Sequence, residues 1–281
     1  MGSVEKPFRI ACVAPGTRMP RELAKRAEDL VFETYDGKVE LEFHPQCFLT
    51  SGHFAGEDSA RIRALADVAN DPEFDAVWFA RGGYGSNRVA EGAISRMTDV
   101  ARAKTFLGYS DTGFLLAGLR KAGFGQVAHG PMPVDVIRGP EGEAAAKRSL
   151  AWLVERSKAS LEKSITPGQK TMAFNLTILS QMLGTPLEPD FTGHVIMLED
   201  VGEYMYRIDR YFFHVTSNLN VRKCAGIRLG RCSAVPKNDP DFGMNEEEVA
   251  RFWCEKSGIA YLGRANIGHD ADNMVVPFGV A

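Results

Sequence analysis

The first half of the chain alternates short apolar runs with amphipathic segments, and few folds are compatible with such an alternation. The apolar runs are expected to be strands, and the segments with apolar residues at helical spacing are expected to be helices. The expected strands are residues 8–14, 39–43, 75–80 and 105–109, and the expected helices are residues 21–30, 57–69 and 113–122. A repeated strand–helix order predicts a mostly parallel sheet with helices on both faces, and hence an α/β fold.

The sequence pattern changes near the middle of the chain. Residues 144–159 are compatible with a helix, and residues 163–170 are polar and include a Pro-Gly pair. We expect a domain boundary here, with an N-terminal domain of residues 1–160, a linker of residues 161–172 and a C-terminal domain of residues 173–281. In the C-terminal domain, helices are expected at 175–183, 206–215 and 246–256, and strands at 194–198, 224–229 and 274–278.

Composition excludes several classes of protein. Among 281 residues, 33 are Lys or Arg and 36 are Asp or Glu, so the net charge is −3, which argues against nucleic acid as the main partner. The five cysteines are odd in number and form no Cys-x-x-Cys pair, which indicates neither a disulfide framework nor a zinc site. We see no signal peptide and no apolar run near the ~18 residues that span a bilayer. A cytoplasmic protein without a membrane partner is expected.

Ser110 lies where an expected strand meets an expected helix, in the run Gly108-Tyr109-Ser110-Asp111. A nucleophile on such a turn is exposed above the sheet, and the helix N-terminus stabilises a nearby anion. Serine is also a common helix N-cap, so this run alone is equally explained by capping. The pattern differs from Gly-x-Ser-x-Gly, because Thr112 replaces the second glycine.

A glycine-rich turn, Arg81-Gly82-Gly83-Tyr84-Gly85-Ser86, follows the neighbouring expected strand. Glycines allow the backbone to approach a ligand closely, and its N–H groups could form an oxyanion hole. Arg81 could bind a carboxylate through its forked guanidinium group. The alternative is a tight turn with no ligand, because the run is neither a P-loop nor a dinucleotide fingerprint.

A nucleophilic serine needs a base and an acid that orients the base. His269 is flanked by Gly268 in a polar loop, and His129, at an apparent strand end, is its competitor. For the acid, the run Leu198-Glu199-Asp200-Val201-Gly202-Glu203 holds three carboxylates after an apolar strand. A solvated turn explains the same run, so the residues alone indicate a hydrolase without fixing its triad.

Several short motifs, in this order, together resemble the L,D-carboxypeptidase family, the serine peptidases that trim murein tetrapeptides and that also include microcin-immunity peptidases. The motifs are Val13-Ala14-Pro15-Gly16, Phe54-Ala55-Gly56, Ala80-Arg81-Gly82-Gly83-Tyr84-Gly85, Gly108-Tyr109-Ser110-Asp111, His129-Gly130-Pro131-Met132, Asn175-Leu176 with Leu183-Gly184-Thr185-Pro186, Leu198-Glu199-Asp200-Val201-Gly202-Glu203 with Tyr206-Arg207-Ile208-Asp209-Arg210, and Gly268-His269 with Asn273 and Pro277-Phe278-Gly279. They cover nearly the whole chain.

The resemblance implies a flavodoxin-like N-terminal domain, a smaller C-terminal α/β domain and an active site in the cleft between them. It assigns the triad to Ser110, Glu199 and His269, with Glu203 as the rival acid, and the oxyanion hole to the backbone N–H groups of Asp111 and Gly83. Arg81, Tyr84 and Glu203 would lie near the substrate. The implied reaction, which needs no metal or organic cofactor, releases terminal D-Ala from a murein tetrapeptide through an acyl-enzyme, in peptidoglycan recycling.

One departure from the family pattern is Asp270, which follows the histidine where relatives often have a small residue. This places the substrate preference in question and leaves the triad intact. Two alternatives remain at this stage. One is a related peptidase that cleaves a peptidyl-nucleotide antibiotic and confers immunity, and the other is a non-catalytic protein that binds a small anion. A homodimer is expected from the prevalence of two-fold oligomers among soluble enzymes.

Overall fold

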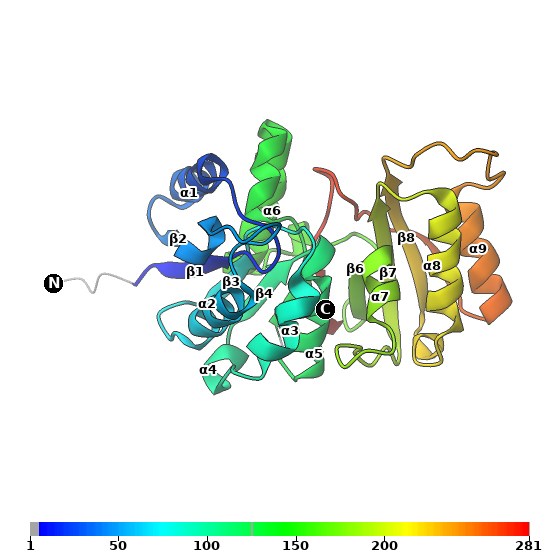
Figure 1. The fold of residues 1–281 in the computed structure, drawn as a ribbon, viewed down its shortest axis with the longest axis horizontal. Coiled ribbons are helices and arrows are strands. Elements are labelled where there is room, and N and C mark those ends of the chain that lie inside the picture. The colour runs from blue at the N-terminus through cyan, green and yellow to red at the C-terminus, as the bar shows by residue number, and fades with distance from the viewer. Residues whose placement is uncertain (1–5, 125, 281) are drawn as a thin grey trace.

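The computed structural model describes residues 6–124 and 126–280, which form two sheets flanked by helices (Figure 1). The first sheet has the strand order β10-β5-β4-β3-β1-β2, and the second has the order β11-β6-β7-β8-β9. Strands pair in parallel in both sheets except β10 and β11, which run antiparallel to β5 and β6. The expected α/β fold is confirmed.

The strands of the first sheet are β1 (Phe8–Val13), β2 (Val39–Phe43), β3 (Ala76–Phe79), β4 (Thr105–Gly108), β5 (Gln126–His129) and β10 (Val276–Pro277). Its helices are α1 (Arg21–Tyr35), α2 (Asp58–Asn70), α3 (Ser86–Ile94), α4 (Asp99–Arg102), α5 (Gly113–Lys121) and α6 (Pro140–Glu155), with 3-10 turns η1 (Pro45–Phe48), η2 (Ser110–Thr112), η3 (Pro133–Arg138) and η4 (Lys158–Ser160). All four residues of β3 are buried, as expected for a central parallel strand covered on both faces.

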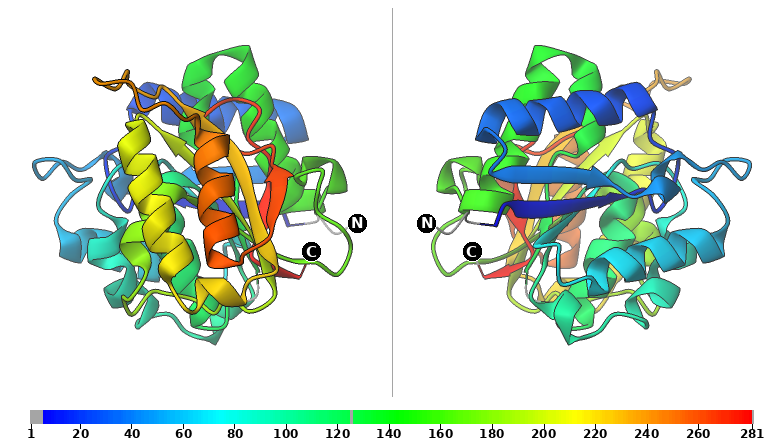
Figure 2. Two further views of the ribbon diagram at one scale, coloured as in Figure 1. Left: turned by 90° about the vertical axis from the view of Figure 1, so that its right-hand side faces the viewer. Right: turned by 90° about the vertical axis from the view of Figure 1, so that its left-hand side faces the viewer.

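The second sheet contains β6 (Lys170–Asn175), β7 (His194–Val201), β8 (Gly226–Ser233), β9 (Tyr261–Arg264) and β11 (Gly279–Val280). Its helices are α7 (Leu176–Met182), α8 (Met205–Ser217) and α9 (Glu246–Ser257), with the turn η5 (Val221–Lys223). Helices α8 and α9 lie side by side over one face of this sheet (Figure 2, left). Asn245 and Glu248 cap the start of α9 reciprocally, and Gly258 ends it in a left-handed conformation.

The apolar core is continuous between the two sheets. One cluster of buried side chains includes residues of α2, α3 and α5 on the first sheet and residues of α7, α8 and α9 on the second. A separate cluster lies under α1 and α6, on the opposite face of the first sheet. The two sheets are therefore packed together through α5 and α7, which brings the ends of their strands into proximity.

Several elements differ from the sequence-based expectation. The helix expected at 144–159 begins at Pro140, which is favoured at the first helical position, and ends at Glu155 because Arg156 adopts a left-handed φ of 56°. The strand expected at 274–278 is divided into β10 and β11, which join different sheets. Strands β6 and β9 and helices α3 and α4 were not expected. The division into residues 1–160, 161–172 and 173–281 stays a prediction, although β6 begins within the expected linker and β10 belongs to the first sheet.

Candidate active site

Ser110 lies on a sharp turn between β4 and α5. Strand β4 ends at Gly108, the turn η2 spans Ser110–Thr112, and α5 begins at Gly113. The turn is tight because a side chain at Gly108 would come within 2.6 Å of the Thr112 hydroxyl oxygen. Ser110 itself has a φ of 61°, in the left-handed region that non-glycine residues avoid. Such strain costs about 1–3 kcal/mol and is concentrated at functional sites.

Glu199 is placed by β7 of the second sheet. Its side chain is fully buried, and the pairing of β7 with β8 is irregular between Leu198 and Asp200, on either side of it. Close packing leaves no room for a side chain at Gly230 of β8, since a Cβ atom there would lie 3.0 Å from the Cβ of Glu199. The Glu199 side chain is therefore packed closely against β8.

His269 lies in the loop between β9 and β10 and connects the other two residues. Its Nδ1 atom is 2.6 Å from Oε2 of Glu199, and its Nε2 atom is 3.0 Å from Oγ of Ser110. Because a carboxylate only accepts hydrogen bonds, Nδ1 carries the proton of the neutral ring and Nε2 is free to accept from the Ser110 hydroxyl. The three side chains thus form one hydrogen-bonded chain.

The environment of His269 tunes its basicity. Burial lowers the pKa of the imidazole, but the charge and hydrogen bond of Glu199, aided by Asp200 and Asp135, favour the protonated ring more strongly. The net effect raises the pKa of His269 above its ordinary value. A ring of this kind accepts a proton more readily than a free histidine while remaining able to release it.

The glycine-rich turn after β3 lies against Ser110. A Cβ atom on Gly82 would be 3.1 Å from Oγ of Ser110, so a side chain at this position would press against the serine. Gly83 has a φ of 93° and abuts Thr17, whose hydroxyl donates to the Gly82 carbonyl at 3.1 Å. Gly16 in turn leaves no space for a side chain against the Gly83 carbonyl. The backbone of this turn is therefore fixed next to the serine.

Asp111 ties this turn to the serine. Its buried carboxylate accepts a hydrogen bond of 2.8 Å from the backbone N–H of Ser86, at the start of α3. Burial raises the pKa of Asp111, against the opposing effect of the hydrogen bonds from Ser86 and Gly85. The side chain of Asp111 thus points to the glycine-rich turn, and its backbone follows Ser110 directly.

The remaining sequence-predicted residues lie around this centre. The half-buried Arg81 donates to the carbonyl oxygens of Arg18 and Gly82, at 3.0 Å and 3.3 Å. Tyr84 is 54 % exposed. Glu203 lies between β7 and α8 and accepts a hydrogen bond of 3.2 Å from Arg207, whereas Glu199 is the carboxylate bonded to His269.

His129, the competing base, is directed elsewhere. Its ring is buried, and Nε2 lies 3.1 Å from Oδ1 of Asn273. Burial lowers the pKa of His129 to about 4, so it is neutral at pH 7. Asn273 also accepts from the backbone N–H of Gly268 at 3.3 Å and thereby supports the loop of His269. The sequence motif around His269 included Asn273, but the sequence alone did not predict that Asn273 supports the His269 loop.

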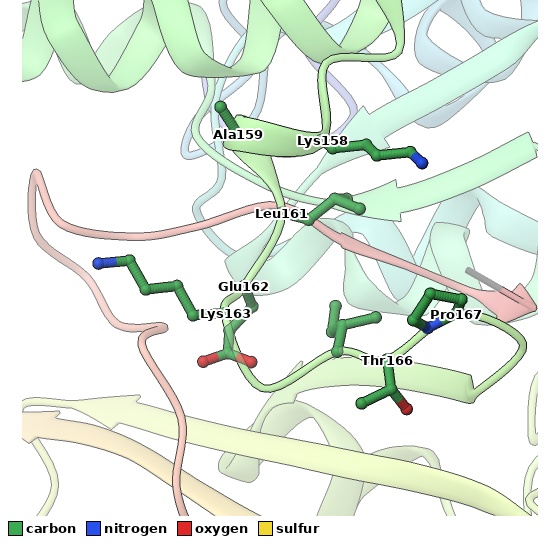
Figure 3. A pocket seen from close by; sticks show the side chains of 8 residues that line it. Lys158, Ala159, Leu161, Glu162, Lys163, Thr166 and Pro167 are labelled. Carbon is green, nitrogen blue, oxygen red and sulfur yellow. The ribbon is translucent and has the colours of Figure 1, made fainter.

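Other features of the described residues contribute no competing centre. A pocket of about 500 Å³ lies on the segment of residues 158–167 (Figure 3), where Lys158 and Lys163 extend to opposite sides. None of its lining residues is Ser110, Glu199 or His269. Within residues 6–124 and 126–280, no group of three or more His, Cys, Asp or Glu side chains is arranged to hold a metal ion. None of the helices found in these residues has the length and apolar character needed to cross a membrane.

The chain is similar to several known proteins. It is 26 % identical over 286 residues to a murein tetrapeptide carboxypeptidase of Pseudomonas aeruginosa, covering 96 % of this chain and 91 % of the relative. The structure of a muramoyltetrapeptide carboxypeptidase from Oxalobacter formigenes aligns with a TM-score of 0.80 and 25 % identity, over 96 % of this chain and 93 % of the other. A microcin C7 self-immunity protein, MccF, has the same fold, with a TM-score of 0.80 at 16 % identity over 99 % of this chain and 92 % of the other.

Family profiles match most of the sequence. Residues 10–130 match the N-terminal domain of LD-carboxypeptidases, and residues 170–281 match their C-terminal domain. Ser110 lies in the first matched segment, and Glu199 and His269 lie in the second. The protein is therefore a member of the LD-carboxypeptidase family of peptidases.

Proposed function

We propose that this protein is a serine-type L,D-carboxypeptidase that releases the terminal D-Ala of murein tetrapeptides during peptidoglycan recycling. The single observation that carries the proposal is the hydrogen-bonded chain from Glu199 through His269 to Ser110. The similarity to murein tetrapeptide carboxypeptidases supports the substrate class. We further propose that the enzyme acts in the cytoplasm.

In this mechanism Ser110 is the nucleophile and His269 is the general base. As Oγ attacks the carbonyl carbon before the terminal D-Ala, its proton passes to Nε2 of His269. His269 then donates that proton to the amine of the departing D-Ala, leaving an acyl-enzyme on Ser110. A water molecule, deprotonated by His269, attacks the ester and regenerates the serine. Glu199 holds the ring in the required tautomer and stabilises the imidazolium.

The backbone N–H groups of Asp111 and Gly83 are proposed to form the oxyanion hole. The N–H that follows a nucleophile on a strand-to-helix turn commonly serves this purpose. Gly83 is next to Gly82, which touches Ser110, and the Asp111–Ser86 hydrogen bond couples the two segments. Donors fixed before the reaction stabilise the developing oxyanion without reorganisation.

Arg81 and Tyr84 are proposed to contact the substrate. Both lie on the turn that carries Gly83, which supplies one donor of the proposed oxyanion hole. A guanidinium group is suited to the free carboxylate that a terminal D-Ala presents. Glu203 is proposed to lie at the edge of the substrate site, with its ion pair to Arg207 limiting its reach.

A product assay tests the proposal. Purified protein is incubated with a murein tetrapeptide that ends in D-Ala and, separately, with the diastereomer that ends in L-Ala, and free alanine is quantified. We expect release from the first substrate only, and no release by a folded Ser110→Ala variant. Turnover of a peptidyl-nucleotide instead of the tetrapeptide would assign the immunity function. Unchanged turnover in Ser110→Ala would exclude the serine mechanism, and binding without turnover would favour the small-anion binder.

The oligomeric state is a separate proposal. We propose a homodimer, and sedimentation analysis at several protein concentrations tests it. A monomer at micromolar concentrations would refute it without affecting the catalytic proposal.

A further inference from the structure

The segment that follows the His129-Gly130-Pro131-Met132 motif contacts both Tyr109, next to the proposed nucleophile, and the backbone of the proposed base, His269. It forms the turn η3, which Pro133 begins and Arg138 ends. Asp135 caps this turn by accepting a hydrogen bond of 2.8 Å from the backbone N–H of Met132. Gly142 of α6 packs against the Asp135 carbonyl with no space for a side chain. The turn is thus anchored to the first sheet and to α6.

One contact of η3 reaches the strand that presents the serine. The hydroxyl of Tyr109, the residue before Ser110, donates to Oδ1 of Asp135 at 2.9 Å. Both side chains are buried. Burial, together with the charge of Asp135, raises the pKa of Tyr109 well above its ordinary value, so the hydroxyl keeps the proton that it donates. Since Tyr109 and Ser110 are adjacent, fixing Tyr109 restrains the strained turn of the nucleophile.

The other contact reaches the base. Arg138 forms an ion pair with Asp135 and donates from Nη2 to the backbone carbonyl of His269 at 2.8 Å. The ring of Tyr109 lies against the ring of His269, with 5.0 Å between their centroids. The path Tyr109–Asp135–Arg138–His269 therefore runs parallel to the direct contact between Ser110 and His269.

We propose that Tyr109, Asp135 and Arg138 form a clamp that sets the position of His269 relative to Ser110. None of the three touches the reacting atoms of the proposed reaction, so they are positioning residues. The inference rests on the proposed function, because it explains how the proposed base is held. Its specific claim is that the guanidinium group of Arg138 governs the reactivity of Ser110.

A reagent that needs no peptide substrate tests the clamp. An alkyl fluorophosphonate reacts with an activated serine: the Oγ–P bond forms, the P–F bond breaks, the serine proton passes to His269 and fluoride leaves. We expect Arg138→Gln to react about tenfold more slowly than the wild-type protein, which is the effect of losing one charge-assisted hydrogen bond. Arg138→Lys, which keeps the charge, should recover part of this loss.

A matched control separates positioning from general stability. Arg26 also bonds a carboxylate, Glu143 of α6, at 2.8 Å and lies outside the candidate site. Arg26→Gln should leave the reaction rate unchanged, and the melting temperatures of both variants show that each is folded under the assay conditions. With the tetrapeptide, the loss in Arg138→Gln should fall on kcat and leave KM nearly constant, because the clamp does not contact substrate.

A double substitution tests whether the path acts as a unit. Tyr109→Phe removes only the hydroxyl and should lower the rate of reaction with the fluorophosphonate by about threefold. The combined Tyr109→Phe, Arg138→Gln variant should be little slower than Arg138→Gln, because both act through Asp135. The clamp would be overturned if the rate losses of the two single variants multiply in the double variant. It would also be overturned if Arg138→Gln reacts at the wild-type rate, or if Arg138→Gln and Arg26→Gln lose the same fraction of the rate.

Failure of the proposed function is distinguishable from failure of the clamp. A wild-type protein that does not react with the fluorophosphonate would refute the serine mechanism. In that case, the NMR signal of the proton between Nδ1 of His269 and Glu199 tests whether the clamp positions His269. Faster exchange of that proton with water in Arg138→Gln than in Arg26→Gln supports the clamp, and equal exchange overturns it.

Discussion

The Nε2 atom of His269 lies 3.0 Å from the Oγ atom of Ser110, although 159 positions separate the two residues in the chain. Ser110 follows β4, and His269 precedes β10, and both of these strands belong to the first sheet. Glu199 comes from the second sheet. The hydrogen-bonded chain thus depends on the way strand β10 returns to the first sheet after the second sheet has formed most of its strands.

The strained backbone of Ser110 has a measurable consequence for stability. We expect Ser110→Gly and Ser110→Ala to be inactive, with the glycine variant more stable by about 1 kcal/mol, because only glycine adopts a φ of 61° without penalty. Urea denaturation of both variants measures the difference in the free energy of unfolding. A glycine variant that is no more stable than the alanine variant would contradict the strained conformation.

The two rival carboxylates give opposite results on substitution. Glu199→Gln should lower kcat/KM by about 10²–10⁴-fold, because an amide neither fixes the tautomer nor stabilises the imidazolium. Glu203→Gln should change kcat/KM by about twofold at most, since Glu203 pairs with the half-exposed Arg207 at 3.2 Å. The reverse pattern in steady-state kinetics would assign the acid to Glu203.

The pH profile reports the state of His269. In the proposed mechanism the neutral ring is the base, and the pKa of His269 is raised above 6.5, so kcat/KM should rise with pH through an inflection above 6.5. Glu199→Gln should move this inflection to lower pH in its residual activity, because the charge that favours the imidazolium is gone. A wild-type inflection below 6.5 would disagree with the observed pairing.

His129 affects stability in acid rather than catalysis. Burial lowers its pKa from 6.5 to about 4, so between these values the unfolded chain binds a proton that the folded protein does not. Neutral His129 therefore makes its full contribution to the free energy of unfolding above pH 6.5. This contribution decreases by about 3 kcal/mol as the pH falls to 4.

The contribution of His129 is measured by difference, because another group opposes it. Burial, with the charge of Glu199, raises the pKa of Asp200 to about 6, so its contribution to stability grows as the pH falls over the same range. Urea midpoints of the wild-type protein and His129→Gln at several pH values isolate the histidine. Parallel pH dependences of the two proteins would show that His129 contributes nothing.

Gly83 combines a positive φ with close packing against Thr17. Gly83→Ala should lower both the melting temperature and kcat/KM. Adding Thr17→Ala should restore part of each, because it removes the two Thr17 atoms that lie nearest to the new methyl group. Gly168→Ala is the matched control: its φ is 81°, but nothing lies within 4 Å of the added carbon. It should show only the backbone penalty of about 1 kcal/mol. Equal effects of the two glycine substitutions would exclude a packing contribution at Gly83.

Local patterns predicted the part of the fold around Ser110. The chain has an apolar strand, then a turn with Ser110, then an apolar run after Gly113, and because these segments are contiguous, periodicity reveals them. Strand β6 (Lys170–Asn175) was missed because its first residues fell in the expected linker of residues 161–172 and its last residue was taken as the start of the helix expected at 175–183. Helix α3 was missed because it begins with the polar residues Ser86, Asn87 and Arg88 after a glycine-rich turn.

Contacts between residues that are far apart in the chain could not be predicted from local sequence patterns. The residues left His269 and His129 as competing bases, and only the family resemblance preferred His269. The difference lies in burial and in the partners Asn273 and Glu199, which no local pattern encodes. Asp135 was not singled out either, because its partner Tyr109 lies 26 positions away in the chain.

The two-residue strand β10 lies next to His129 and follows the loop of His269. During synthesis, the serine turn is complete long before this strand leaves the ribosome. In the proposed mechanism, a nascent chain therefore carries the nucleophile Ser110 without its base His269 until residues 269–277 have been added.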